Sequence, residues 1–375
     1  MITVQIGDIF QSDAQTLINT VNCVGVMGKG IALEFKKRFP KMFEDYAHRC
    51  KEGRVKLGEP YLYRRLTPPW ILNFPTKDHW RSVSRLEDIV AGLEHVRQHC
   101  KEWGIASLAV PPLGCGQGQL EWRVVGPTLY RQLKQLDIPV QLFAPFGTPH
   151  EELRLSFLNN TDQNEYVPSG PDTSYRVSPG WVGLVKILDG IEREPYHWPV
   201  GRTTFQKIAY FATESGIPTG LRYQRGSYGP YASELKRHIT ALVNNGLIRE
   251  ERLGRMFAVR TGQTFQDASR AYAEQLQQWH EVIEKIKDLF MRMNTQQSEV
   301  AATVHFAARE LKQTGEKRPT ETEVLRQVMD WKQKRRPPFE EKEVALTIRN
   351  LNMLCWIGAE PSSDLPVTEE DVLNV

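Results

Sequence analysis

The pattern of apolar residues changes about halfway along the chain. Between residues 1 and 146, short apolar runs alternate with longer stretches of helical period, which predicts strands that alternate with helices. This alternation is typical of an α/β sandwich built around a largely parallel or mixed sheet. The predicted strands are ITVQI at 2–6, TLINTV at 16–21, WILNF at 70–74, SLAVPP at 107–112 and VQLFAPF at 140–146, and the predicted helices cover residues 31–52, 84–103 and 121–136.

Helical periods dominate the second half of the chain, in residues 181–191, 203–215, 231–248 and 264–293. Residues 247–259 instead predict two short strands around Leu253 and Gly254, and helices followed by a hairpin resemble a winged helix. A segment between the halves, rich in Asn, Asp, Pro, Ser and Gly, predicts a linker. We therefore predict a first domain at 1–155, a linker at 156–176 and a mainly α-helical, winged-helix-like domain at 177–375.

The composition narrows the class of protein. With 375 residues, of which 40% are hydrophobic and 25% charged, the chain is long enough for two cores, and its net charge of +3 does not mark it as a nucleic-acid binder. Its cysteines lack CxxC spacing and its histidines lack the spacing of metal ligands, so we expect no disulfide framework, metal or other cofactor. No apolar stretch reaches the ~20 residues that span a bilayer, and no basic leader precedes the first strand. We expect a cytoplasmic protein without membrane contact.

Polar or glycine-rich loops after the predicted strands hold the candidate chemistry. In GDIF at 7–10, the Asp8 carboxylate can accept a hydrogen bond from an exocyclic amine, although an Asp here can also serve as a turn or helix cap. In NTVNCVGVMGKGIALEF at 19–35, Gly25, Gly28 and Gly30 precede a predicted helix, so backbone N–H groups can approach a diphosphate. The alternative is a simple tight turn, and the spacing matches neither a P-loop nor a dinucleotide-binding fingerprint.

The next such loop, PPLGCGQGQLEW at 111–122, leaves another strand through Gly114, Gly116 and Gly118 and enters a helix. Two such loops at the carboxyl ends of strands in one sheet favour a dinucleotide-like ligand in the crevice there. Lys77 follows the strand at 70–74 and is expected at the same rim. A lone loop lysine is usually solvated, but one between two phosphate loops is a candidate catalytic amine.

These motifs resemble the macrodomain family: GDI near the N-terminus, NxVN followed by GKGIA, and PxLGCGxGxLxW. The pattern is most similar to the branch with the animal terminal ADP-ribose glycohydrolase and the bacterial DarG antitoxins, which remove ADP-ribose placed on thymidine bases in DNA by DarT-type toxins. The resemblance implies a three-layer α/β/α sandwich with a mixed sheet. It also implies that Asp8 and Ile9 hold the adenine of ADP-ribose, and that Phe146 stacks near the adenine or proximal ribose. The implied diphosphate loops consist of Lys29, Gly30, Ile31 and Ala32 on one side and of Leu113, Gly114, Cys115, Gly116, Gln117 and Gly118 on the other. The resemblance further implies that Asn22 orients the distal ribose and that Lys77 is catalytic together with Asn22.

One position departs from this branch. The animal glycohydrolase carries an acidic residue in its GCG loop that helps to release a lysine-bound intermediate, and Gly118 stands at that position here. This leaves covalent catalysis open and favours a Lys77 that assists cleavage between the anomeric carbon and the thymine nitrogen, with Asn22 and loop amides stabilising an oxocarbenium-like ribose. Glu34 or Asp78 is expected to assist the water, and Cys115 to be a small loop residue rather than a nucleophile.

Contacts with ADP-ribosylated DNA are predicted beside Lys77. Basic and aromatic residues are interleaved there, and aromatic rings stack on bases while arginines bind phosphates. The alternative is an ordinary surface on which the aromatic residues cover the core. The candidates are His79, Trp80 and Arg81, with Tyr61, Tyr63, Arg64 and Arg65 as further partners.

The second domain resembles, more loosely, the winged-helix-like domains of bacterial antitoxins, with Gly229 and Pro230 at the start of a helix. The resemblance implies that it binds a DarT-type ADP-ribosyltransferase toxin. The basic run at 332–336 is expected to form part of that interface or a solvated helix end. The alternative partner is operator DNA, with phosphate contacts from Arg222, Arg225, Lys236 and Arg237.

The leading hypothesis is therefore an antitoxin enzyme that hydrolyses the bond between ADP-ribose and thymidine in DNA and binds the toxin through its second domain. One alternative is a non-catalytic ADP-ribose reader fused to a DNA-binding regulator. Another is a hydrolase of ADP-ribosylated protein or of O-acetyl-ADP-ribose, because the same pocket accepts several attachments at the distal ribose.

Overall fold

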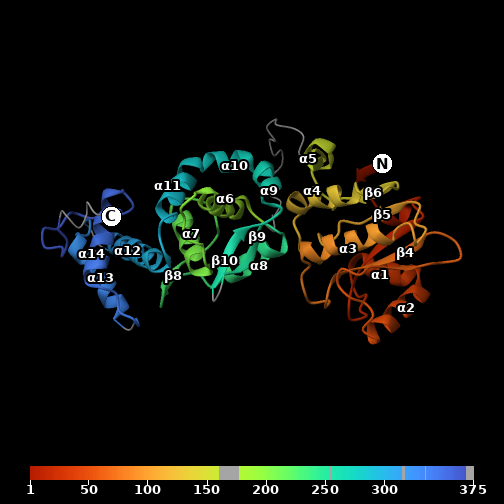
Figure 1. Cartoon of the computed structure of the whole chain (residues 1–375), viewed down its shortest axis with the longest axis horizontal. Helices are drawn as coiled ribbons and strands as arrows, with labels where there is room; N and C mark the ends of the chain where they lie inside the picture. Colours follow the sequence, from red (N-terminus) through yellow and green to blue (C-terminus); the bar gives the residue numbers. More distant parts are fainter. Residues whose placement is uncertain (160–176, 254–255, 315–316, 334, 369–375) are drawn as a thin grey trace. The chain divides into compact units, whose positions relative to one another are not determined.

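The computed structural model describes residues 1–159, 177–253, 256–314, 317–333 and 335–368 (Figure 1). Most of the predicted linker and Gly254 lie outside these ranges. The chain divides into two compact units. The first contains Met1–Val182, His238–Arg249 and Thr261–Gln278, and the second contains Gly183–Arg237, Glu250–Arg260 and Trp279–Val375. Parts of the second half of the sequence thus belong to the first unit.

A six-stranded mixed sheet lies at the centre of the first unit, in the order β1-β6-β5-β2-β4-β3. All neighbouring pairs are parallel except β3 and β4, which are antiparallel. The sequence pattern missed β3, a strand of three half-buried residues at the edge of the sheet. The strands are β1 (Ile2–Gln5), β2 (Thr16–Asn22), β3 (Tyr61–Tyr63), β4 (Trp70–Lys77), β5 (Leu108–Val110) and β6 (Val140–Phe143).

Helices cover both faces of this sheet, so the predicted three-layer α/β/α sandwich is confirmed. On one face, Leu17 and Val21 of β2 belong to one buried cluster with Phe35 of α1 (Gly30–Arg38) and Met42 of α2 (Pro40–Lys51). The other face carries α3 (Leu86–His99), where Gly92 lets the helix approach the ring of Phe74 in β4. Helix α4 (Trp122–Leu133) packs beside α3.

The single helix predicted at 31–52 is in fact two helices. They divide at Phe39, and Pro40 is the first residue of α2. A proline has no N–H to donate and clashes with a preceding helical turn, but it fits the first position of a new helix. The break lets α1 begin at the rim of the sheet while α2 takes its own direction across the same face.

The remaining elements are mostly helices, as predicted for the second half of the chain (Figure 1). The hairpin predicted after the helices is present as β9 (Ile248–Leu253) and β10 (Met256–Thr261), which pair with each other. None of the described helices is long and apolar enough to cross a bilayer. The other elements are η1 (Ile9–Gln11), η2 (His150–Leu153), α5 (Leu155–Asn159), α6 (Pro179–Arg193), α7 (Arg202–Glu214), α8 (Leu235–Asn244), α9 (Phe265–Ala271), α10 (Ala273–Gln278), α11 (His280–Phe290), α12 (Thr295–Thr314), α13 (Glu321–Lys332) and α14 (Glu341–Met353).

One local expectation for the second unit is wrong, and one of the two alternatives for the basic run does not hold. Gly229 and Pro230 do not begin a helix but lie in β8 (Gly229–Tyr231), which pairs with β7 (Gln224–Gly226). The left-handed φ of +83° at Gly229 suits the tight turn of this hairpin. Within the basic run, Lys332 and Arg335 are not a solvated helix end, because both bind the buried carboxylate of Glu299 at 3.0 Å.

Candidate active site

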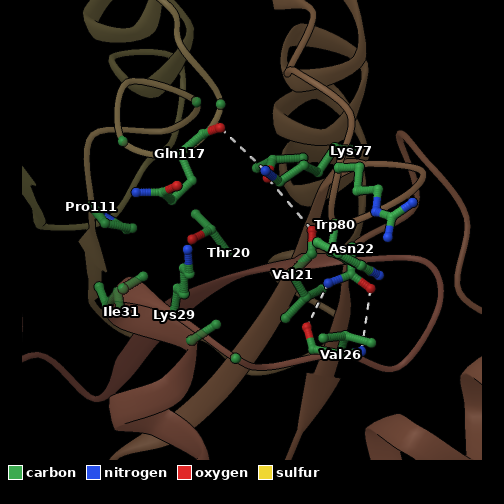
Figure 2. A pocket seen from close by; sticks show the side chains of 18 of the residues that line it. Thr20, Val21, Asn22, Val26, Lys29, Ile31, Lys77, Trp80, Pro111 and Gln117 are labelled. Atoms are coloured by element: carbon green, nitrogen blue, oxygen red, sulfur yellow. Dashed lines mark hydrogen bonds between the residues drawn. The ribbon is translucent and has the colours of Figure 1, made fainter.

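A cavity of about 670 Å³ opens where the carboxyl ends of β2, β4 and β5 meet at one edge of the sheet (Figure 2). Because these strands are parallel, the loops that follow them converge on the same space. The lining comes from the ends of β2 and β4, from the loop that follows β4, and from the two glycine-rich loops. It consists of Thr20, Val21, Asn22, Val26, Gly28, Lys29, Gly30, Ile31, Ala32, Thr76, Lys77, Trp80, Arg81, Pro111, Pro112, Gly114, Gly116, Gln117 and Gly118.

The register of the sheet brings Asn22 and Lys77 together. The pairing of β2 with β4 runs evenly from Thr16 and Trp70 up to Val21, where a bulge shifts it by one residue. Beyond the bulge, Asn22 is the strand partner of Lys77. A bulge at the end of a pair redirects the side chains that follow it. These two residues are 55 positions apart in sequence but neighbours at the rim of the cavity.

The amine of Lys77 lies between the loops that follow β4 and β5. Its Nζ donates to the backbone carbonyls of Ser82 and Gln117, each at 3.2 Å, and Figure 2 shows the second of these bonds. Burial lowers the pKa of Lys77 below its ordinary value. Since an ammonium group has three N–H bonds, and these two carbonyls are its hydrogen-bond acceptors within the described chain, one N–H remains for a group in the cavity.

The side chain of Asn22 closes the loop after β2. Its Oδ1 accepts from the N–H groups of Val24 and Val26 at 3.0 and 3.3 Å, and its Nδ2 donates to the carbonyl of Val26 at 2.5 Å. The hydroxyl of Tyr46 donates to the backbone carbonyl of Asn22 at 2.8 Å. Sequence reasoning gave Asn22 a ligand-orienting role and missed this structural one. An amide that shapes its own loop in this way holds the backbone around the cavity in one conformation.

The N-terminus of α1 borders the same cavity. Helix α1 begins at Gly30, whose φ of +58° suits glycine, and Lys29 is its N-cap residue. The lining residues Gly30, Ile31 and Ala32 form its first turn. Backbone N–H groups in a first turn lack partners within the helix and carry a partial positive charge. This rim therefore suits the negative charge of a phosphate.

Gly118 stands at the most restricted point of the loop after β5. Its carbonyl accepts from the N–H of Ser84 at 2.9 Å. A Cβ at this position would overlap both the Ser84 hydroxyl and the carbonyl of Gly114. Gly114 has a φ of +76° and is also packed closely, against Leu120. At Gly116, by contrast, a Cβ would meet nothing within 4 Å. The loop thus needs glycine at 118 for steric reasons.

Several residues predicted for the ligand site do not line this cavity. Asp8 caps η1 by accepting from the N–H of Phe10 at 3.0 Å, and Ile9 is buried in the core of the sandwich. Leu113 and Cys115 are buried within the loop after β5, and Phe146 is 81% exposed. Gly28, one of the glycines of the predicted diphosphate loop, does line the cavity. Among the lining residues, sequence reasoning missed Thr20, Val21, Val26, Thr76, Pro111 and Pro112. Position could have indicated them, because each lies within two residues of a residue that was predicted.

The predicted DNA contacts divide into two groups. Trp80 and Arg81 line the cavity, Trp80 is 47% exposed, and the Arg81 guanidinium lies 4.6 Å from the centroid of its indole ring. His79 packs its ring against Trp80. Elsewhere, Arg64 donates to the carbonyl of Trp103 and Arg65 to that of Pro69, while Tyr61 and Tyr63 pack against the core. These four residues do not line the cavity.

Glu34 and Asp78, the residues predicted to assist the attacking water molecule, do not line the cavity. Glu34 forms an ion pair with Lys37 at 2.8 Å on α1. Hydrogen bonds from the Ser82 side chain and the His79 N–H lower the pKa of Asp78. Within the residues that the structure describes, no group of three or more His, Cys, Asp and Glu side chains is placed to hold a metal ion.

Comparisons with known proteins place these features in context. A family model described as "Macro domain" matches residues 18–129. A DNA ADP-ribosyl glycohydrolase from Mycobacterium bovis is 39% identical, over 64% of this chain and 66% of that protein, so the chain spans just under two thirds of this relative. A DNA ADP-ribosyl transferase-DNA ADP-ribosyl glycohydrolase fusion protein from Thermosipho africanus is 41% identical over 40% of this chain and 43% of the fusion. The solved macrodomain of Mycobacterium tuberculosis DarG is 47% identical, with a TM-score of 0.37 over 39% of this chain and 98% of that one.

The packing at Gly118 leads to a prediction about stability. Gly118→Ala should lower the free energy of unfolding by ~1–3 kcal/mol, because the added methyl group overlaps Ser84 and Gly114 and the loop must move. Gly116→Ala is the matched control and should stay within ~0.5 kcal/mol of the parent, since its Cβ points into open space. Urea unfolding followed by tryptophan fluorescence measures both. Equal stabilities for the two variants would contradict the packing described here.

Proposed function

We propose that this chain, which belongs to the macrodomain family through its first domain, binds ADP-ribose in the cavity and hydrolyses its bond to thymidine bases in DNA. The observation that carries the proposal is the position of the Lys77 amine, which lies between two loops suited to a diphosphate. The identity of 39% with a protein named DNA ADP-ribosyl glycohydrolase supports both the reaction and the DNA substrate.

The two glycine-rich loops would hold the diphosphate of ADP-ribose between them. The first turn of α1 offers backbone N–H groups on one side, and the Lys29 ammonium adds a positive charge there. The loop of residues 114–118 offers the other side. With the diphosphate in this place, the distal ribose extends toward the paired ends of β2 and β4. Its anomeric carbon then lies near Asn22 and Lys77.

In the proposed reaction, the bond between the anomeric carbon and the thymine nitrogen breaks and both electrons pass to the base. Negative charge then develops on the thymine nitrogen and its flanking carbonyls, while the ribose becomes oxocarbenium-like. The Lys77 ammonium stabilises this charge and transfers a proton to the base. A water molecule attacks the anomeric carbon and gives its proton to the neutral Lys77 amine, which restores the ammonium. Thymidine in DNA and free ADP-ribose are the products.

This role follows from how Lys77 is held. Two carbonyl acceptors stabilise the charged form, so the side chain is a ready proton donor, although burial lowers its pKa and makes the proton easier to release. A covalent attack by the amine would require the neutral form before cleavage. It would also benefit from a nearby acid to release the adduct, and Gly118 has no space for one.

The DNA strand would enter beside Lys77. Trp80 offers an exposed ring on which a base can stack, and Arg81 offers a guanidinium for a phosphate. Both line the cavity and follow Lys77 closely in sequence, and the modified base must lie near Lys77 if the amine is to reach it. Tyr61, Tyr63, Arg64 and Arg65 are left out of this proposal, because they pack against or hydrogen bond to other parts of the domain.

We further infer that the region from residue 177 binds an ADP-ribosyltransferase toxin. The Thermosipho relative is named as a fusion of a DNA ADP-ribosyl transferase with a glycohydrolase, so the two activities occur together in one chain there. The alternative, binding of operator DNA by this region, is less favoured. One of its predicted phosphate contacts, Arg225, forms an ion pair with Glu310 at 2.7 Å and covers the ring of Trp331.

Replacing Lys77 tests the catalytic proposal. Lys77→Met keeps much of the side-chain length but removes the proton donor, so kcat on an oligonucleotide with ADP-ribosylated thymidine should fall ~100-fold or more. The affinity for free ADP-ribose, measured by calorimetry, should change little. Lys37→Met is the matched control, because Lys37 pairs with Glu34 on α1 and does not line the cavity.

The pH profile gives a second readout for Lys77. The ammonium is the active form, so kcat should stay level at neutral pH and fall as pH rises through an apparent pKa below 10.5. A rate that rises through that range would support a neutral nucleophile instead. If the parent binds ADP-ribose but never clears the oligonucleotide, the reader hypothesis is favoured, and clearance of modified protein alone would point to a protein hydrolase.

Replacing Trp80 tests the DNA contact. Base stacking on an aromatic ring contributes ~1–3 kcal/mol, so Trp80→Ala should raise KM for the modified oligonucleotide by about 10-fold. Affinity for free ADP-ribose should change less than 2-fold or so, because the ring is proposed to contact the base. Tyr196→Ala, at a tyrosine 88% exposed in the second unit, is the control for loss of a surface aromatic. An unchanged KM in Trp80→Ala would remove the stacking proposal.

Toxin binding can be separated from catalysis. The full chain and a purified cognate ADP-ribosyltransferase should co-elute in size-exclusion chromatography as a stoichiometric complex. Lys77→Met should bind the toxin as tightly as the parent, because the proposed toxin-binding region does not include the first domain's catalytic lysine. Absence of any complex at micromolar concentrations would refute the toxin-binding part of the proposal and leave the hydrolase part intact.

A further inference from the structure

The turn that joins α8 to β9 lies against the candidate active-site loops within the first unit. Asn245 in this turn is 1% exposed. Its Oδ1 accepts from the backbone N–H of Glu121 at 2.8 Å, and its Nδ2 donates to the carbonyl of Ala241 at 2.8 Å. The amide therefore joins the end of α8 to a residue that precedes it by more than a hundred positions. A buried amide satisfied on both sides holds its two partners in a fixed relation.

Glu121 is the residue at which the loop after β5 ends. It is the N-cap residue of α4, and the Leu120 N–H just before it donates back to the carbonyl of Gly114 at 3.0 Å. The loop of residues 114–120 is thus closed at its base, and Asn245 holds the position of that base. Gln117, whose carbonyl accepts from the Lys77 amine, lies in the middle of this loop.

The same turn also lies close to the end of the other loop. A Cβ at Gly246 would lie 3.2 Å from Cδ2 of Leu86, the first residue of α3. Leu86 ends the segment that contains Ser82, the second acceptor of the Lys77 amine, and Ser84, which donates to Gly118. Asn245 therefore binds the end of one of the loops that hold Lys77, and Gly246 lies close to the end of the other.

We infer that Asn245 is a positioning residue for Lys77, which acts by fixing the base of the loop that carries Gln117. The part of the chain beyond residue 177 then contributes directly to the geometry of the site. The catalytic consequence rests on the proposed function, but the effect on the loop does not. Weakening this hydrogen bond should free residues 114–121 to fluctuate and displace one of the two acceptors of the Lys77 amine.

Two substitutions of Asn245 in the full chain separate positioning from folding. Asn245→Asp keeps an acceptor for the Glu121 N–H, and its charge is favoured at the N-terminus of α4, but it loses the donor to Ala241. Asn245→Leu has a similar size and loses both bonds. Both variants should lower the melting temperature of the chain, because each removes the side-chain hydrogen bond to the Ala241 carbonyl, which keeps only the backbone N–H of residue 245 as a donor.

Hydrogen exchange of the loop and the rate of the reaction should change in only one of the two Asn245 variants. In Asn245→Leu, amide hydrogen exchange of residues 114–121 should become about 10-fold faster and kcat on the modified oligonucleotide should fall ~3- to 10-fold. In Asn245→Asp, both should stay within about 2-fold of the parent. The exchange measurement needs no enzymatic activity, so it tests the inference even if the proposed function fails.

Arg131→Ala is the matched control for the general packing of this segment. Arg131 lies near the other end of α4 and pairs with Asp267 of α9 at 2.7 Å, so its loss weakens the same packing away from the loops. Exchange and kcat should match the parent. The inference is overturned if Asn245→Leu leaves the exchange of 114–121 unchanged, or if Asn245→Asp or Arg131→Ala speeds that exchange as much as Asn245→Leu does.

Discussion

Ser84 donates its backbone N–H to the carbonyl of Gly118 at 2.9 Å, and this bond joins the loop after β4 to the loop after β5. The Lys77 amine lies between the same two loops and is held by a carbonyl from each. The contact between Gly118 and Ser84 is so close that no side chain fits at 118. The two loops consequently act as one body, and the position of the amine depends on both of them staying together.

The same constraint limits the chemistry available to the site. The Cβ of an acidic residue at 118 would overlap the Ser84 hydroxyl and the Gly114 carbonyl, so the loop cannot carry the acid that the resemblance assigns to this position in the animal glycohydrolase without rearranging. The amine instead has two neutral carbonyls as neighbours, which favour the ammonium without neutralising it. Such a group suits the stabilisation of a departing anionic base more than attack on the sugar.

Much of the site could be predicted because it follows from local pattern. Glycines after parallel strands indicate loops at one edge of a sheet, and that logic predicted Gly28, Gly30, Lys77 and Gly118 at one cavity. It was less informative where a residue type admits two uses. Asp8 caps a short helix, which is one of the two roles that its position after a strand predicts, and strand β3 was too short to show alternation. The bulge that pairs Asn22 with Lys77 also cannot be predicted from the sequence of either strand alone.

Asn245 shows the limit of local pattern most clearly, since nothing near it in sequence indicates a contact with Glu121. The free energy that its hydrogen bond to Glu121 contributes is small. A single buried hydrogen bond contributes about 0.5–1.5 kcal/mol, whereas ordering each loop residue costs about 1–2 kcal/mol in backbone entropy. One bond therefore cannot order the loop of residues 114–120 alone, and it adds to the bonds that Leu120 and Ser84 make with Gly114 and Gly118. The first domain is consequently expected to hold its cavity without Asn245, and to hold it more firmly with it.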